Sequence, residues 1–294
     1  MFIDAHLHTI RSPGLPRNAA GDTFATPEEL IAMMDATGVD KGVLLPDMSP
    51  ECVFQMSTCE DILEICAAHP DRFVPFCNVD PRAQANSPSA DLSFALKYYA
   101  GRGCRGLGEI TANLPFADPL VRNLFRHCET CRLPVIFHIA PQAGGFYGLV
   151  DGLGLPGLAQ ALRDFPALVF IGHSQPFWAE ISGDLTAAAR NTYPSGPVAP
   201  DGALVRLMDT YPNLCCGWDA GSGYNGLTRD PAFGYRFMET YQDRILFGTD
   251  ICSPKNKHLH AQYLRQALAD GHISREAFEK ISWRNANRLF SLGL

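Results

Sequence analysis

Near the N-terminus, Asp4, His6 and His8 alternate with apolar residues. In an extended strand alternate side chains share a face, so these three would point one way and the apolar ones between them the other way. Two neutral imidazoles that converge from one strand are suited to bind one transition-metal ion, because imidazole is the commonest side-chain ligand of such ions. Asp4, on the same face, could orient one of the two rings. The spacing therefore predicts part of a metal site.

Four more ionisable residues stand at or next to the last residue of a short apolar run: Glu109, His138, His173 and Asp250. Burying such a group costs free energy unless it is paired with an opposite charge or bound to a metal ion. Any one of them alone could be a satisfied core residue. Together with the HxH pair, they indicate that several strand ends contribute to one polar site.

The elements that would position these residues are eight short apolar runs separated by helical segments. Because the runs are apolar throughout rather than alternating, they are typical of parallel strands covered on both faces. We predict strands over residues 2–9, 41–46, 72–79, 104–110, 134–139, 168–173, 214–219 and 244–250. We predict helices over residues 26–38, 50–68, 91–100, 158–165, 204–211, 258–270 and 275–289, and two more that begin at Asp118 and Asp230.

Eight strand–helix units in 294 residues predict an α/β fold, a closed (β/α)8 TIM barrel that forms a single domain over residues 1–294. An open doubly wound sheet is disfavoured, since no glycine-rich phosphate loop follows the first strand. In a TIM barrel the carboxyl ends of all strands meet at one rim. The residues that would share this rim are His6, His8, Glu109, His138, His173 and Asp250.

Charge and composition narrow the partners and the compartment. The net charge is −7 and no basic run occurs, which argues against nucleic acid and anionic membranes as partners. No stretch approaches the roughly 18 uncharged apolar residues of a membrane span, and the N-terminus lacks the pattern of a signal peptide. The ten cysteines are scattered rather than arranged as a disulfide framework, so the sequence predicts a reduced, cytoplasmic protein.

Two further motifs have the residue types of a metal site. Cys128 and Cys131 form a CxxC, but no second CxxC or nearby histidine pair completes a zinc site. His258 and His260 form a second HxH, but they fall where a helix is expected, and residues two apart on a helix do not share a face. We expect a structural role for both motifs.

Four segments of the chain together resemble the amidohydrolase superfamily, and within it the amidohydrolase-related group that contains aminocarboxymuconate-semialdehyde decarboxylase. The segments are Asp4-Ala5-His6-Leu7-His8, Ile136-Phe137-His138, Ile171-Gly172-His173 and Phe247-Gly248-Thr249-Asp250. The resemblance implies a metal-dependent barrel enzyme that acts on a small-molecule substrate, with a homodimer as a possible assembly. Residue by residue, the matches to the superfamily's metal ligands are His6, His8, His138 and Asp250. His173 matches the site histidine near substrate and water.

Glu109 departs from the decarboxylase-like members of the superfamily. Many superfamily members carry a carboxylate on the fourth strand that bridges two metal ions, whereas the decarboxylase-like members hold one ion without it. We predict that Glu109 is a metal ligand, and both one and two divalent ions stay open. Zinc is the expected ion for imidazole and carboxylate ligands, and manganese or iron would also fit.

The site predicts a hydrolase that uses a metal-activated water to cleave a C–N, C–O or P–O bond of a small molecule. Asp250 would take the proton of the water and pass it to the leaving group, and His173 would polarise the substrate oxygen. One alternative is a metal-dependent, non-oxidative decarboxylase of an aromatic or enoic acid, because the same ligands could hold a substrate carboxylate beside the ion. A second alternative is a catalytically silent barrel that acts as a binding protein.

Substrate contacts are expected from loops at the same rim. Segments 141–147, 174–202 and 220–226 follow the fifth, sixth and seventh predicted strands and are rich in glycine and aromatic residues, which suits a mobile lid. The candidates for substrate contact are Trp178, Tyr224, Asn225 and Arg229. Arg229 would bind an anionic group such as a carboxylate, or hold its loop through an ion pair.

Overall fold

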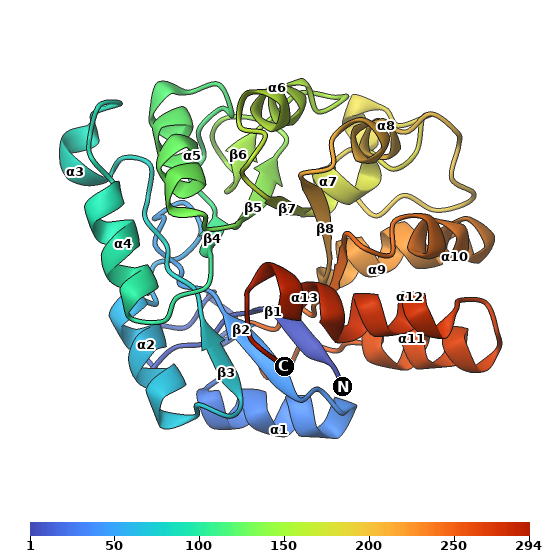
Figure 1. Cartoon of the computed structure of the whole chain (residues 1–294), viewed down its shortest axis with the longest axis horizontal. Coiled ribbons are helices and arrows are strands. Elements are labelled where there is room, and N and C mark those ends of the chain that lie inside the picture. The colour runs from blue at the N-terminus through green and yellow to red at the C-terminus, as the bar shows by residue number, and fades with distance from the viewer.

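The computed structural model describes residues 1–294, and eight parallel strands surround a common centre with helices outside them (Figure 1). The barrel strands are β1 (Ile3–Leu7), β2 (Lys41–Leu44), β3 (Phe73–Pro75), β4 (Leu107–Ile110), β5 (Val135–Ala140), β7 (Phe170–His173), β8 (Leu214–Trp218) and β9 (Ile245–Phe247). A two-residue strand, β6 (Leu149–Val150), pairs with β5 beside this ring. The predicted TIM barrel is confirmed.

Backbone hydrogen bonds close the ring where the two sheets of the barrel meet. The sheets have the strand orders β1-β2-β3 and β4-β5-β7-β8-β9. Beyond β3, the Cys77 N–H donates to the Gly106 carbonyl at 3.0 Å. Beyond β9, the Asp250 N–H donates to the His6 carbonyl at 2.9 Å. The first and last predicted site residues are therefore joined directly through the backbone.

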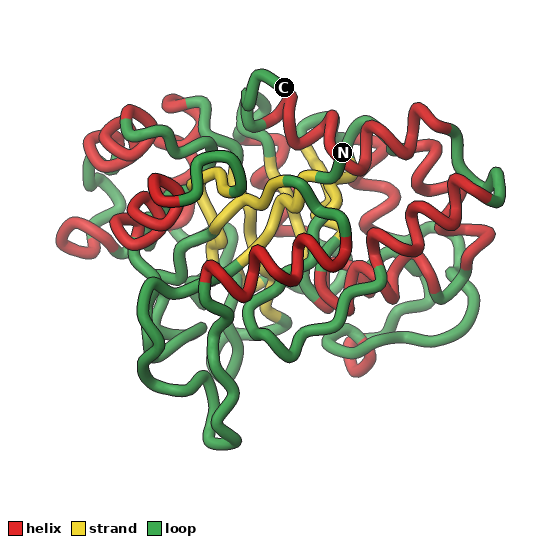
Figure 2. Tube along the Cα trace, turned by 90° about the horizontal axis from the view of Figure 1, so that it is seen from below, coloured by secondary structure: helices red, strands yellow, loops and turns green.

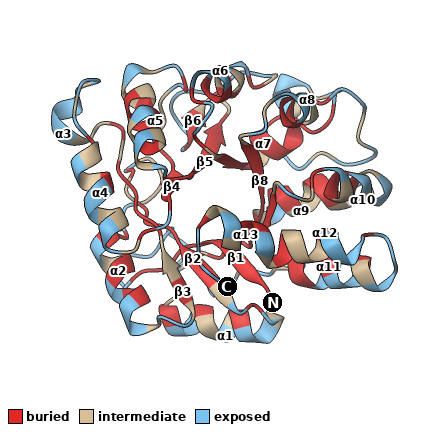
Figure 3. Ribbon diagram, in the orientation of Figure 1, coloured by how far each residue is buried: buried red, intermediate tan, exposed pale blue.

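Helices cover the outside of the barrel and turn their buried sides toward the strands (Figure 3). The larger helices are α1 (Pro27–Thr37), α2 (Cys59–Ala68), α4 (Ser93–Gly101), α5 (Pro119–Cys131), α6 (Pro156–Asp164), α8 (Ala203–Thr210), α9 (Ala220–Thr228), α10 (Pro231–Thr240) and α11 (His260–Ala269). The short ones are α3 (Ala83–Asn86), α7 (Gln175–Ala179), α12 (Arg275–Glu279) and α13 (Asn285–Leu289). None of these helices combines the length and the apolar character that a membrane crossing requires.

Three predicted segments differ from the structure. The helix predicted over residues 50–68 begins only at Cys59, because Thr58 and Asp61 form a capping box in which each side chain accepts a hydrogen bond from the other's backbone N–H. The helix predicted over residues 275–289 is interrupted by a π-helical turn at Lys280–Arg284. The glycine-rich segment 220–226, predicted as part of a lid, belongs to helix α9.

Two apolar clusters fill the molecule. An inner cluster of 11 buried residues takes side chains from most barrel strands, and an outer cluster of 58 packs the strands against the helices. Ala286 and Phe290 belong to the inner cluster, so the C-terminal segment closes one end of the barrel. Long loops lie at the opposite end from the two termini (Figure 2). Polar side chains of the strands can therefore meet solvent only at the loop end.

The strict alternation predicted for β1 is wrong. Ile3 and Ala5 belong to the inner cluster, but Leu7 belongs to the outer one. The pairing of β1 with β2 shifts register between Asp4 and Leu7. Such an irregularity changes the direction of the side chains near the end of a strand.

Candidate metal centre

Two histidines and two carboxylates meet at the carboxyl end of β1. The Nε2 atoms of His6 and His8 lie 2.9 Å apart. The Oε2 atom of Glu109, from β4, is 3.6 Å from the first of these nitrogens and 3.4 Å from the second. The Oδ1 atom of Asp250, after β9, is 3.6 and 3.5 Å from them. Ligands at tetrahedral corners about 2.0–2.1 Å from zinc are about 3.3–3.4 Å apart, so each carboxylate oxygen lies at about ligand spacing from the two histidine nitrogens.

Carboxylates on the far side of the two rings orient them. His6 Nδ1 hydrogen-bonds to Asp219 Oδ2 at 3.0 Å, and His8 Nδ1 lies 3.2 Å from Asp47 Oδ2. A carboxylate beside Nδ1 favours the tautomer that is protonated there, which leaves the Nε2 lone pair free for a metal ion. In that neutral tautomer the two Nε2 lone pairs lie 2.9 Å apart and next to two carboxylate oxygens. The chemistry of this donor set fits a cation.

His173, the last residue of β7, lies between two carboxylates. Its Nε2 hydrogen-bonds to Glu109 Oε1, and its Nδ1 lies 3.0 Å from Asp219 Oδ1. Asp219 therefore contacts both His6 and His173, one with each oxygen. Glu109 likewise turns one oxygen toward His173 and the other toward the His6–His8 pair. This network holds three of the predicted site residues in fixed positions.

Charge within the cluster competes with burial. Burial opposes protonation of His6, but Asp219 and Asp250 outweigh it and raise its pKa to about 9. Burial alone would raise the pKa of Glu109, yet His173 and the other histidines beside it hold that pKa well below its usual range. Burial outweighs the histidines at Asp250 and raises its pKa. The carboxylates thus create a field that favours positive charge at the centre of the cluster.

His138, on β5, lies beside this cluster, next to the ring of His173. Its ring centroid is 5.0 Å from that of His173 and 4.4 Å from that of Tyr147, and its Nδ1 atom has no hydrogen-bond partner. Burial lowers its pKa to about 3, which keeps the ring neutral near pH 7. Two groups of three side chains are close enough together to hold an ion: His6 with Glu109 and His173, and His6 with His8 and Asp250. The assignment of His138 as a ligand stays a prediction.

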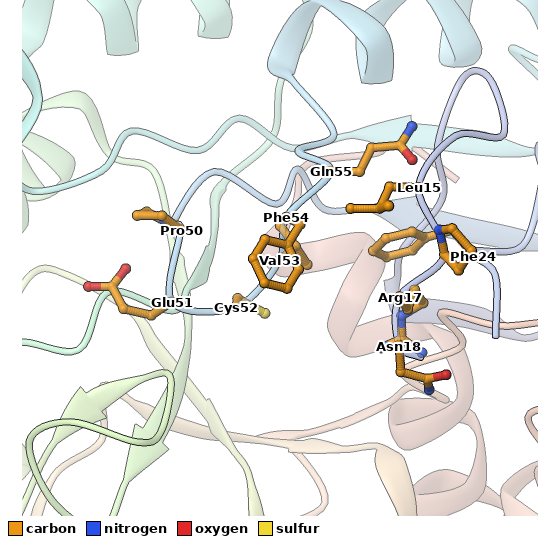
Figure 4. Close-up of a pocket in the computed structure, with 11 residues that line it drawn as sticks. Leu15, Arg17, Asn18, Phe24, Pro50, Glu51, Cys52, Val53, Phe54 and Gln55 are labelled. Atoms are coloured by element: carbon orange, nitrogen blue, oxygen red, sulfur yellow. The ribbon is translucent and has the colours of Figure 1, made fainter. Parts of the chain in front are cut away.

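A cavity of about 50 Å³ opens onto the cluster, and its wall includes His8, Glu109, His138, His173 and Asp250. The Asp250 side chain is 26% exposed, whereas those of His8 and Glu109 are 5% and 4% exposed. Asp250 is therefore the group of the cluster that a molecule in the cavity reaches most easily. A larger cavity of about 230 Å³ adjoins the first, between the loop that follows β1 and the loop that follows β2 (Figure 4).

Three residues at this rim adopt left-handed backbone angles although they are not glycine. Asp250 has a φ of 56°, Ser174, which follows His173, has 111°, and Ala220, which follows Asp219, has 52°. Such conformations cost about 1–3 kcal/mol each and persist where the surrounding structure holds them, commonly at functional sites. The chain therefore bends sharply at the strand ends that carry the polar cluster.

The prediction that Asp4 orients a histidine ring is wrong. Its carboxylate accepts hydrogen bonds from the backbone N–H groups of His6 and Thr249, both at 3.0 Å, and from the Thr249 hydroxyl at 2.6 Å. Asp4 therefore ties β1 to the strand end that carries Asp250. It positions two site residues through the backbone and contacts neither ring.

The carboxylates that do lie beside the rings, Asp219 and Asp47, were missed from the sequence. A signal for both was present, because Asp219 ends the seventh apolar run as Asp250 ends the eighth, and Asp47 directly follows the second run. The rule that found Asp250 would have found Asp219 as well.

The four residues predicted to contact substrate lie outside the lining of the 50 Å³ cavity. Trp178 is buried and donates its indole N–H to a backbone carbonyl at 3.0 Å. Tyr224 and Asn225 belong to α9. Arg229 follows that helix, beside Asp230. Their role in substrate binding stays a prediction, and the lid expected at residues 220–226 is replaced by a helix.

Comparison with solved structures finds the same barrel in other proteins. The chain is similar to an uncharacterised TIM-barrel protein of Bordetella bronchiseptica, with 20% identity, a TM-score of 0.69, and coverage of 99% of this chain and 98% of that chain. It is similar to 5-carboxyvanillate decarboxylase of Sphingomonas paucimobilis, with 18% identity, a TM-score of 0.60, and coverage of 99% and 98%. It is also similar to a candidate 2-pyrone-4,6-dicarboxylic acid hydrolase of Pseudomonas putida, with 15% identity, a TM-score of 0.63, and coverage of 100% and 98%. At these identities the likeness establishes the fold.

Comparison of the sequence with curated proteins finds no match. The sequence profile of the family described as amidohydrolase matches residues 3–292. This match includes every barrel strand and all the residues of the polar cluster. The chain therefore belongs to the amidohydrolase family.

Proposed function

We propose that this amidohydrolase is a metal-dependent hydrolase that uses a metal-activated water to cleave a C–N, C–O or P–O bond. As a member of the family the protein is an enzyme, and enzymes of this family act on small molecules and generally bind a divalent metal ion. The observation that carries the proposal is the convergence of four donor atoms. Glu109 Oε2 and Asp250 Oδ1 both lie 3.4–3.6 Å from two histidine nitrogens that are themselves 2.9 Å apart.

The residues that would hold the ion are His6, His8, Glu109 and Asp250, and His138 would be a further ligand through its match to the superfamily motif. A bound divalent ion supplies a Lewis acid and lowers the pKa of a coordinated water toward about 7. Zinc suits imidazole and carboxylate ligands best, and manganese or iron also fits them. Because the rings are already oriented by carboxylates, little ordering is required when an ion binds.

Asp250 is our candidate for the acid–base residue. It is the most exposed member of the cluster, with a side chain that is 26% accessible, and it lines the cavity. A carboxylate in this position can accept the proton of an attacking water and return it to the leaving group. His173, whose pKa is raised because Asp219 and Glu109 outweigh its burial, holds a positive charge that would stabilise a developing negative charge on the substrate.

A decarboxylase is the second candidate. Structures similar to this chain include 5-carboxyvanillate decarboxylase and the 2,6-dihydroxybenzoate decarboxylase of Rhizobium, with TM-scores of 0.60 and 0.59. The same cluster could hold a substrate carboxylate beside the ion, with its C–C bond facing the cavity. Product analysis separates the two reactions, since one releases carbon dioxide and the other adds water across the cleaved bond.

The test begins with the metal content of the purified protein and of protein reloaded with zinc, manganese or iron. The loaded enzyme is then given esters, lactones, amides, phosphoesters and aromatic acids. In the variant Asp250→Asn we expect kcat to fall by about 10²–10⁴-fold with the melting temperature nearly unchanged. The control is Asp35→Asn, whose side chain is 62% exposed far from the cluster, and which should keep full activity.

Two outcomes would reject the hydrolase. Full turnover in Asp250→Asn would remove the acid–base role, and protein that never takes up a divalent ion would remove the metal. Release of carbon dioxide from aromatic acids, with no hydrolysis of any other compound, would favour the decarboxylase instead.

A further inference from the structure

We propose that Asn113 is a positioning residue, which holds the loop after β5 against His138 and so fixes one wall of the cavity at the metal centre. This loop, residues 141–148, carries Tyr147, which lines the 50 Å³ cavity. Asn113 follows β4 and is not itself part of that wall. The inference rests on the proposed function only in taking this cavity as the place of reaction.

The loop covers His138 with two consecutive residues. The ring centroid of Tyr147 lies 4.4 Å from that of His138. Gly148 packs against the same ring so closely that a Cβ atom on it would lie 2.7 Å from His138 Nδ1. His138 is 8% exposed beneath these residues, whereas residues 142–145 face solvent. The position of this loop therefore decides how accessible His138 is.

The backbone of the loop contributes little to holding it there. Residues 141–147 neither donate nor accept a backbone–backbone hydrogen bond. Gly144 and Gly145 have φ angles of 73° and 74°, and a Cβ atom on either would meet no other atom within 4 Å. Segments with few contacts and exposed backbone open at low free-energy cost. A loop of this kind stays closed only if side chains from elsewhere hold it.

The side-chain amide of Asn113 makes the contacts that the backbone lacks. Its Oδ1 accepts a hydrogen bond from the Gly144 N–H at 2.6 Å. Its Nδ2 donates to the carbonyls of Gln142 at 3.2 Å and Gly148 at 3.4 Å. No other hydrogen bond reaches residues 141–147. One amide thus joins the exposed part of the loop to the residue that packs on His138.

Asn113 is in turn bonded to a network of charged side chains. Its backbone N–H donates to Glu51 Oε1 at 3.4 Å. Glu51, which lines the larger cavity (Figure 4), accepts hydrogen bonds from both terminal nitrogens of Arg82 at 2.7 and 2.9 Å. Arg82 also donates to both carboxylate oxygens of Asp80 at 2.7 Å. Because such charge-assisted, bidentate contacts are strong, Asn113 has a fixed base from which to position the loop.

The contacts require an amide at this position, since one donor and one acceptor are used together. An aspartate has nearly the same shape and could still accept from Gly144. It would, however, turn an oxygen toward the carbonyls of Gln142 and Gly148, which need a donor. We therefore expect Asn113→Asp to loosen the loop, and Asn113→Ala to loosen it more.

The first test is hydrogen–deuterium exchange, measured by mass spectrometry on the zinc-loaded protein. Amides of residues 142–148 should exchange at least about tenfold faster in Asn113→Ala and at least about threefold faster in Asn113→Asp. The matched control is Asn213→Ala. The Asn213 amide also donates to backbone carbonyls, three of them at 3.1–3.2 Å, but it directly precedes β8 at the other end of the barrel. This variant should leave the exchange of residues 142–148 unchanged.

The second test measures the cover over His138 through its modification by diethyl pyrocarbonate, located by peptide mass spectrometry. Zinc is first removed with a chelator, so that a bound ion cannot protect the ring. The pKa of His138 is lowered to about 3 by burial, so the ring is neutral near pH 7 and reacts once it is reached. Its modification should be at least about tenfold faster in Asn113→Ala, with exposed His272 unchanged as the internal reference. A general loss of stability would instead accelerate it in Asn213→Ala as well.

The inference is overturned if residues 142–148 or His138 keep their wild-type rates in a folded Asn113→Ala, or if Asn213→Ala accelerates both equally. If Asn113→Ala does not fold, wild-type rates in Asn113→Asp overturn it. The hydrolase proposal fails separately, because neither readout depends on turnover. A protein inactive on every compound would still show the dependence of the loop on Asn113.

Discussion

The chain contains two HxH pairs, and comparison of the two shows what makes a metal centre in this fold. His6 and His8 lie at the carboxyl end of β1, where their Nε2 atoms are 2.9 Å apart and carboxylate oxygens lie within 3.6 Å of both. His258 lies two residues before α11, which begins at His260 rather than at the predicted residue 258, and neither ring forms an ion pair with a carboxylate. The same HxH motif therefore occurs in two different structural environments.

The second pair is part of the packing around α9 and α11. The His260 Nε2–H donates to the Ala220 carbonyl at 3.0 Å, and its ring lies 5.0 Å from that of Trp218 and 5.2 Å from that of Tyr224. The Nε2 atom of His258 has no hydrogen-bond partner. His260 is therefore a buried core side chain with one polar contact, whereas His258 is half-buried.

The pKa values of the two pairs move in opposite directions for a clear reason. Burial lowers the pKa of His258 and of His260 to about 4. The same burial acts on His6, but Asp219 and Asp250 outweigh it and raise the pKa to about 9. The nearby carboxylates, rather than the spacing of the histidines, distinguish a site for cations from a buried ring.

The largest expected effect comes from removing one histidine of each pair. In His6→Asn, loss of a direct ligand should weaken metal binding by more than the roughly 10–100-fold that loss of an orienting partner causes, and activity should fall with it. In His260→Gln the ion should remain, because that ring contacts only backbone and aromatic groups. Metal content by mass spectrometry and kcat/KM measure both. Equal metal loss in the two variants would contradict the comparison.

The second prediction compares two buried aspartates, Asp219 and Asp4, whose roles cannot be told apart from the sequence. In Asp219→Asn, metal affinity should fall by about 10–100-fold, because His6 and His173 both lose a charged partner. In Asp4→Asn, the free energy of unfolding should fall by about 1–3 kcal/mol, because buried hydrogen bonds to Thr249 are weakened. Its metal affinity should change much less. Competition with a chelating dye measures the metal affinity, and denaturant titration measures the free energy of unfolding. If Asp4→Asn lost metal affinity and Asp219→Asn lost only stability, our assignment of the two roles would be wrong.

The barrel could be predicted from the sequence because eight continuous apolar runs leave few other folds open. The helical structure of segment 220–226 could not be predicted, since the local preference of its glycines indicates a loop. In the structure a Cβ atom on Gly226 would lie 2.8 Å from the Trp178 ring, and one on Gly223 would lie 3.1 Å from its indole nitrogen. These glycines let α9 approach a buried tryptophan, which is a tertiary effect that composition does not reveal.

The polar cluster could be predicted to the extent that its members end apolar strands. His6, His8, Glu109 and Asp250 satisfy that rule, and both carboxylates lie within 3.6 Å of the two histidine rings. Arg17, which lines the 50 Å³ cavity, does not satisfy it, because it lies in a loop that is tied down by a hydrogen bond between residues 231 positions apart. Residues on strand ends are thus accessible to sequence reasoning, whereas loop residues at the same site require coordinates.

A smaller effect is expected from Asp47→Asn. Asp47 contacts only His8, at 3.2 Å, whereas Asp219 contacts two histidines at 3.0 Å. Metal affinity should therefore fall by about tenfold, at the lower end of the range for such partners. The same chelator competition measures it. A loss larger than that of Asp219→Asn would mean that His8, rather than His6, depends most on its orienting carboxylate.

The smallest effect is a difference in the pH dependence of stability, measured as melting temperature with a chelator present. The pKa of His6 is about 9 in the folded protein and about 6.5 in the unfolded chain, so the folded state holds more protons between these values. The stabilisation by His6 is complete below pH 6.5 and is lost as the pH rises to 9. The decline over this window should be weaker in His6→Asn.

His260 should have the opposite signature, because its folded pKa of about 4 lies below the unfolded value. The unfolded chain then holds more protons between pH 6.5 and 4, and stability falls as the pH decreases through that window. His260→Gln should reduce this acidic decline and leave the alkaline one unchanged. If both variants altered the same decline, acidic or alkaline, in the plot of melting temperature against pH, the carboxylates around His6 would not explain the difference between the two HxH pairs.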